Sequence, residues 1–91
     1  MTTKEPAPKN KYMEAMEELN PDAMYPTGFE DAMTGIVSKD GTDVFSISTR
    51  KCLDILRERD GMSWEDAIDY FEYNIHGSYM GKNNPVYDHD I

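Results

Sequence analysis

The chain has little cysteine and no long apolar run. Its single cysteine, Cys52, leaves no partner for an internal disulfide, which is typical of proteins from reducing compartments. No apolar run approaches the roughly 18 residues that a membrane-spanning helix needs. The first residues, MTTKEPAPKNK, lack the hydrophobic segment of a secretory signal. We therefore expect a soluble protein of the cytoplasm.

Cations are scarce. The chain has 9 Lys and Arg against 18 Asp and Glu, a formal net charge of -9, and residues 62–91 hold six acids beside one lysine. Direct nucleic-acid binding is disfavoured because phosphate contacts depend on clustered cations. An anionic surface instead attracts basic partners, although many acidic surfaces serve only solubility. With 91 residues the chain has room for one domain with a modest core.

The N-terminal third divides into an arm, a helix and a loop. Residues 1–10 have almost nothing to bury, so we expect a disordered arm. Residues 11–20 form a short helix that Asn10 caps and Pro21 ends, and the rest of 11–28 is a loop. A helix this short needs a surface to lie on. We expect it to pack on its own domain or on a second copy in a homodimer, with a Met-rich docking helix as the alternative.

A β-hairpin over 32–48 follows. Asp40-Gly41 is the dipeptide of a two-residue type I′ turn, which places Lys39 opposite Thr42. This register assigns Ile36, Phe45 and Ile47 to one face and Met33, Val37 and Val44 to the other. The first face has the larger side chains and is the predicted core face. Gly35 within the strand marks a bulge or a close approach by a neighbouring element, or it is equally a neutral position.

Two helices follow the hairpin, over 49–60 and 63–77. Ser48 or Thr49 caps the first, and Gly61 is its expected left-handed terminator. Ser63 caps the second. In this helix a periodic apolar stripe faces the core; its members are Trp64, Ala67, Ile68, Phe71 and Ile75.

A short strand at 85–88 completes the predicted fold. We expect it to pair antiparallel to the second hairpin strand, because antiparallel pairs are commoner than parallel ones. The prediction is an α+β fold in which a small antiparallel sheet is covered by a helical hairpin. Residues 29–88 then form a single domain, and 89–91 a loose tail.

The outward side of the last helix is the candidate functional surface. Glu65, Asp69, Glu72 and His76 recur at helical spacing opposite the apolar stripe, beside Asp66. Tyr70, Tyr73 and Tyr79 stand near them, and tyrosines are favoured at protein interfaces. These eight residues form the predicted partner-binding set. The alternative is that the acids serve only to keep the protein soluble and the tyrosines cover the sheet.

A ligand-binding alternative rests on a carboxylate and an imidazole four residues apart. Glu72, Asn74 and His76 would line a pocket closed by the loop at 77–84, as a small-ligand or metal site. Any acidic amphipathic helix with one histidine often produces this spacing, and no HExxH arrangement is present. The terminal tripeptide Asp88-His89-Asp90 is a still weaker candidate for a metal site. We therefore expect no metal, no cofactor and no catalytic residues.

Several segments resemble a family of short uncharacterised proteins from bacteriophages and bacteria. The matching segments are FEDA at 29–32, KCLDIL at 51–56, DGMS at 60–63, EDA at 65–67, YFEYN at 70–74, Gly77 and Pro85. The family's usual form resembles RDGMSxEEAxEYFEFN followed by GAWxGExTP, so the likeness covers about residues 29–87. The chain departs from it at residues 78–80 and 82–84. The resemblance implies a phage setting and transfers no catalytic residue.

Charge and resemblance together predict how the protein acts. We expect a small, acidic, non-enzymatic protein of phage type that binds and modulates a host protein with a basic surface. Proteins that handle nucleic acid or serve defence are candidate targets, and in the sharpest form of this hypothesis the acidic helix mimics DNA. A homo-oligomeric structural protein is a further alternative, based on the N-terminal helix.

Overall fold

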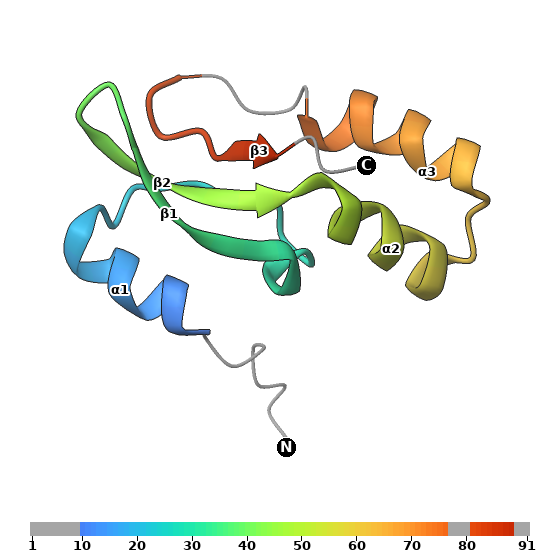
Figure 1. The fold of residues 1–91 in the computed structure, drawn as a ribbon, viewed down its shortest axis with the longest axis horizontal. Helices are drawn as coiled ribbons and strands as arrows, with labels where there is room; N and C mark the ends of the chain where they lie inside the picture. Colours follow the sequence, from blue (N-terminus) through green and yellow to red (C-terminus); the bar gives the residue numbers. More distant parts are fainter. Residues whose placement is uncertain (1–9, 77–80, 89–91) are drawn as a thin grey trace, which may run out of the picture.

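The computed structural model describes residues 10–76 and 81–88 (Figure 1). Its elements follow in the order α1 (Lys11–Leu19), a 3-10 turn (Glu30–Ala32), β1 (Met33–Lys39), β2 (Thr42–Ser48), α2 (Thr49–Asp60), α3 (Trp64–Tyr70), a π-helical turn (Phe71–His76) and β3 (Val86–Asp88). Three strands form one sheet in the order β1-β2-β3. The predicted α+β class is confirmed. The arm at 1–9 and the tail at 89–91 lie outside the described residues.

The hairpin of β1 (Met33–Lys39) and β2 (Thr42–Ser48) forms as its turn predicts. Asp40 and Gly41 have φ values of 54° and 82°, the positive values that a type I′ turn requires. Lys39 pairs with Thr42, and Ile36 with Phe45. The predicted register is confirmed over this part of the ladder.

At the start of β1 the predicted register is wrong. Met33 pairs with Ile47 and Gly35 with Ser46, so Thr34 is an extra residue in a β-bulge. The Thr34 hydroxyl donates to the Ser46 carbonyl at 3.1 Å. The extra residue turns Met33 from the predicted outer face onto the core face, where it is 5% exposed.

The direction of β3 (Val86–Asp88) is also different from the prediction. It runs parallel to β2, with Ser46 beside Val86, whereas the sequence suggested an antiparallel strand. The physical reason is that the chain first returns to the turn end of the hairpin. There Met24 N–H donates to the Asn83 carbonyl at 3.0 Å and Lys39 Nζ to the Asn84 carbonyl at 3.1 Å. A strand that starts at that end runs alongside β2.

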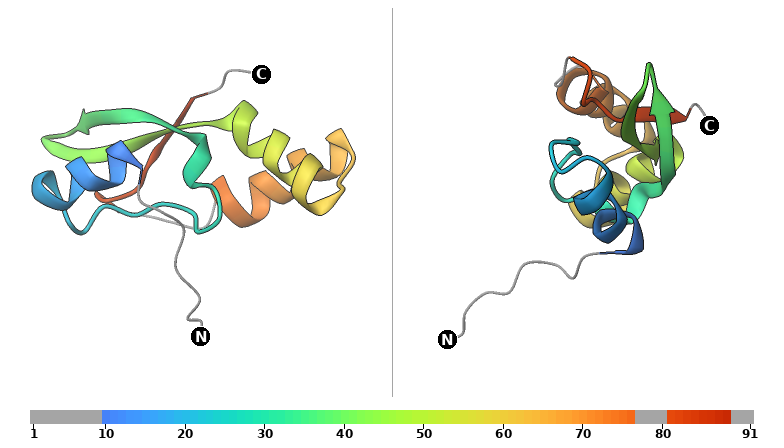
Figure 2. Two further views of the ribbon diagram at one scale, coloured as in Figure 1. Left: turned by 90° about the horizontal axis from the view of Figure 1, so that it is seen from below. Right: turned by 90° about the vertical axis from the view of Figure 1, so that its left-hand side faces the viewer.

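The helices lie on one side of the sheet. Figure 2 shows α1 (Lys11–Leu19) and α3 (Trp64–Tyr70) on the same face, with α1 over β1 and β2. α2 (Thr49–Asp60) continues directly from β2, because Ser48 ends the strand and caps the helix. Its end at Gly61, with φ 69°, is the predicted left-handed terminator.

The core lies between the helices and the inner sheet face. Its buried members are Met16, Phe29, Ala32, Met33, Phe45, Ile47, Cys52, Leu53, Leu56, Ala67, Phe71 and Ile75. Phe71 meets Tyr87 of β3 edge to face, with ring centroids 5.3 Å apart. The N-terminal helix therefore packs on its own domain, as Met16 is 3% exposed. No helix in the described part of the chain is both long enough and apolar enough to span a membrane.

Candidate partner-binding surface

α3 begins where the sequence predicts. The Ser63 hydroxyl accepts a hydrogen bond from the Asp66 N–H at 3.1 Å, the bond that defines an N-cap. Glu65 and Asp66 lie in the first turn, where the positive end of the helix dipole favours negative side chains. The carboxylates at this end of the helix thus stabilise the element that carries them.

After Tyr70 the helix changes its hydrogen bonding. Residues Phe71–His76 form a π-helical turn, a change from the continuous α-helix predicted to 77. A π-helical turn is closed by hydrogen bonds between residues i and i+5 and holds more than four residues. Phe71 and Ile75, four residues apart, are therefore less than one turn apart and both face the core. They are 2% and 3% exposed. Tyr73, midway between them, is pushed outward and is 82% exposed.

The outward residues form one surface, here called the acidic-tyrosine surface. Its members are Glu65, Asp66, Asp69, Tyr70, Glu72 and Tyr73, all of them exposed. Tyr70 is 39% exposed, far less than its neighbour Tyr73. A tyrosine with most of its ring in water presents apolar area that a partner can bury. Carboxylates and such rings occur side by side on this one helical segment.

The acids of this surface have no cation on their own helix. Residues 64–76 contain no Lys or Arg. Within the described part of the chain, the ion pairs join Arg50 to Asp54 at 3.9 Å and Arg59 to Asp60 at 3.2 Å, and none reaches the acidic-tyrosine surface. Its negative charge is therefore not neutralised by these arginines.

The arginines of α2 contact aromatic rings. The Arg57 guanidinium lies 5.2 Å from the centre of the Trp64 ring, and that of Arg50 lies 6.0 Å from it. Arg59 lies 4.9 Å from the Phe29 ring and donates to the Gly28 carbonyl at 3.0 Å. Trp64, predicted as a core residue, is in fact half-buried beneath two arginines. The spacing of Arg50 and Arg57, seven apart on one helix, was the available signal for this stack.

Two predicted site residues are not placed by the structure. His76 ends the π-helical turn, but its side chain is not described, and Tyr79 lies outside the described residues. The alternative pocket around Glu72, Asn74 and His76 depends on both this side chain and the loop. Glu72 and Asn74 are exposed. Among the described side chains, no three His, Cys, Asp or Glu come together as a metal site would require.

Comparison with family models, curated proteins and solved structures finds no match to this chain. The resemblance to short phage and bacterial proteins therefore stays a prediction.

Sequence analysis missed a hollow at the end of the molecule opposite α3 (Figure 1). It lies between α1, the following loop and β2, and Met13, Met16, Tyr25 and Phe45 are among its lining residues. Two methionines three apart on a short helix were the signal for it. That signal did not show that the loop at 21–25 forms the facing wall.

Proposed function

We propose that this protein is a non-enzymatic binding protein that uses the acidic-tyrosine surface to contact a basic surface on another protein. The observation that carries the proposal is a helix whose four outward acids lack any cation on the same segment and stand beside a tyrosine 82% exposed. Charge supplies attraction over a distance, and the ring supplies apolar contact area once the partner has docked.

The resemblance to phage proteins suggests the kind of partner. Small acidic phage proteins often bind host proteins, and host proteins that handle nucleic acid have the basic surfaces that this helix would fit. Acids one helical turn apart, such as Glu65 and Asp69, have Cβ atoms about 5 to 6 Å apart. This spacing is close to the phosphate interval along a DNA strand, so DNA mimicry is the sharpest form of the proposal.

The test is a pulldown from host lysate with a charge-removing variant. Glu65→Gln, Asp66→Asn, Asp69→Asn and Glu72→Gln together remove four negative charges from the surface. The matched control removes four exposed charges elsewhere, through Glu14→Gln, Glu18→Gln, Asp22→Asn and Glu58→Gln. Both variants have the same net charge, so any difference between them depends on position.

The expected result is a partner that the wild type and the control variant capture and the surface variant loses. Its recovery should fall steeply between about 50 mM and about 200 mM salt, because interactions between many charges are screened. Equal capture by the two variants would show that only net charge matters. Recovery of no partner at either salt concentration would count against the proposal as a whole.

A further inference from the structure

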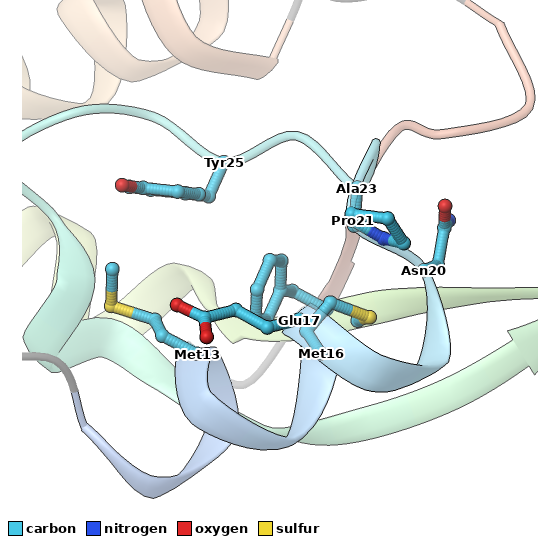
Figure 3. A pocket seen from close by; sticks show the side chains of 8 residues that line it. Met13, Met16, Glu17, Asn20, Pro21, Ala23 and Tyr25 are labelled. Carbon is cyan, nitrogen blue, oxygen red and sulfur yellow. The ribbon is translucent and has the colours of Figure 1, made fainter.

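The hollow beside α1 is a pocket of about 170 Å³. Met13, Met16 and Glu17 of α1 form one wall, and Ala23 and Tyr25 of the following loop form the other (Figure 3). Phe45 of β2 also lines the pocket. Met16 and Phe45 are buried, so this part of the lining belongs to the core. The pocket is separate from the acidic-tyrosine surface and does not depend on its function.

Asparagines hold both ends of the helix that forms the pocket. Asn10 accepts from the Met13 N–H at 2.9 Å and donates to the Glu30 carbonyl at 3.1 Å. Asn20, at the other end, donates to the Asp43 carbonyl at 2.9 Å and to the Asn83 side chain at 3.0 Å. These hydrogen bonds fix α1 at both ends and keep it apart from the loop. The pocket is therefore formed before any ligand binds.

The facing wall is fixed as well. The Tyr25 ring packs edge to face on Phe45, with centroids 5.7 Å apart. The Met24 N–H donates to the Asn83 carbonyl at 3.0 Å, which ties the loop to the segment before β3. The two walls therefore keep their separation through contacts with different parts of the domain.

Size and lining indicate the apolar part of a ligand. A cavity of about 150 Å³ lined by apolar side chains holds one benzene ring. The pocket here is slightly larger, and methionine side chains adapt to the shape of a bound group. One aromatic ring, or an aliphatic group of that size, matches this volume.

The charged side chain that lines the pocket indicates the polar group of the ligand. In Figure 3 the Glu17 carboxylate points into the space below Tyr25, next to the Met13 thioether. An ammonium group at this position would meet a carboxylate, and the Tyr25 ring offers a face for a cation. The net charge of -9 draws cations toward the protein and repels anions.

We propose that this pocket binds a small amine whose apolar part is a single ring, with the ring between α1 and Tyr25 and the ammonium group at Glu17. Benzylamine is the probe for this class. Benzyl alcohol and phenylacetate present the same ring with a neutral and an anionic end. The predicted order of affinity is benzylamine, then benzyl alcohol, then phenylacetate.

The experiment is a titration of the isotope-labelled full chain, followed by amide NMR shifts. Benzylamine should give saturable shifts confined to residues 13–25 and Phe45. Glu17→Gln should weaken benzylamine about threefold to fivefold and leave benzyl alcohol unchanged, because one exposed charge pair is removed. Glu65→Gln, the same change on α3, should alter neither ligand.

Filling the pocket is the second arm. Ala23→Leu adds a branched side chain to the wall and should abolish saturable binding of benzylamine, while amide shifts of β1 and β2 show that the variant is folded. Equal affinity for the three ligands, shifts spread over all acidic residues, or no saturable shift at millimolar benzylamine would each overturn the proposal. Unchanged binding by folded Ala23→Leu would do the same.

Discussion

The two helices of the helical hairpin, α2 and α3, differ in burial and in charge. α2 buries Thr49, Cys52, Leu53 and Leu56, whereas α3 buries Ala67 alone before its π-helical turn begins. In charge, α2 has four cations and three anions, and residues 64–76 have four anions and no cation. α2 has the composition of an element that holds the fold together. The segment after it presents most of its side chains to water, as a contact surface does.

The two helices also differ in the contacts of their charged side chains. The α2 arginines contact Trp64 and Phe29, and the acids of α3 are left to solvent. A chain that only needed solubility could have placed these charges as pairs across the two helices.

The largest effect is expected from the core of α2. Leu56 is fully buried, so Leu56→Ala should lower the free energy of unfolding by about 2 to 5 kcal/mol through lost burial and a cavity. Tyr73→Ala, on the exposed segment, should change it by less than about 0.5 kcal/mol. Urea unfolding followed by circular dichroism measures both. Comparable losses of unfolding free energy in Leu56→Ala and Tyr73→Ala would contradict the difference in burial between the two helices.

The caps of the two helices give the next comparison. Ser48 caps α2 and is 2% exposed, and Ser63 caps α3 at an exposed position. Ser48→Ala should destabilise by about 1 to 2 kcal/mol, because the Lys51 N–H in the first turn of α2 loses its bond to a buried hydroxyl. Ser63→Ala should destabilise by about 0.5 to 1 kcal/mol. The same unfolding measurement applies. The reverse order would mean that α3 contributes more to stability than its burial suggests.

The contact between the helices comes third. Arg57→Gln keeps much of the side chain but removes the charge over Trp64, and should destabilise by about 0.5 to 1 kcal/mol. Trp64 is the single tryptophan, so its fluorescence reports this site directly. Arg57→Lys is the control, because it keeps the charge without the planar group. An unchanged emission spectrum and stability in Arg57→Gln would argue against the stack.

The smallest effect concerns repulsion on the acidic-tyrosine surface. Glu65 and Asp69 are like charges one helical turn apart, so Asp69→Asn should raise stability by about 0.2 to 0.5 kcal/mol at low salt. The gain should vanish at high salt, where the repulsion is screened. Asp54→Asn on α2, which removes the partner of Arg50, should give no gain. A loss of stability in Asp69→Asn would point to a favourable contact of that carboxylate.

Local chemistry made much of the fold predictable. Asp40-Gly41 determines the turn and hence the pairing of Lys39 with Thr42, and Ser63 and Gly61 mark helix ends through their own backbone preferences. These signals lie within a few residues of the feature that they predict. For the same reason the exposed acids and tyrosines of α3 could be assigned to one face from their spacing.

Features that depend on distant contacts were not predictable. The direction of β3 depends on where Asn83 and Asn84 bond, to Met24 and Lys39, and no pattern in the strand itself records that. The bulge at Thr34 was suggested by Gly35, but its effect on Met33 needed the partner strand. The pocket beside α1 likewise depends on Asn10 and Asn20, whose bonding partners lie 20 to 63 residues away in the sequence.

The most direct test of the contact surface is an amide NMR titration of the labelled protein with an arginine-rich octapeptide. If the acidic-tyrosine surface is the contact surface, saturable shifts will concentrate in residues 64–76 and weaken sharply as salt rises. The four-charge surface variant will lose these shifts, and its charge-matched control will keep them. Shifts spread evenly over all acidic residues, or concentrated on α1, would contradict this prediction.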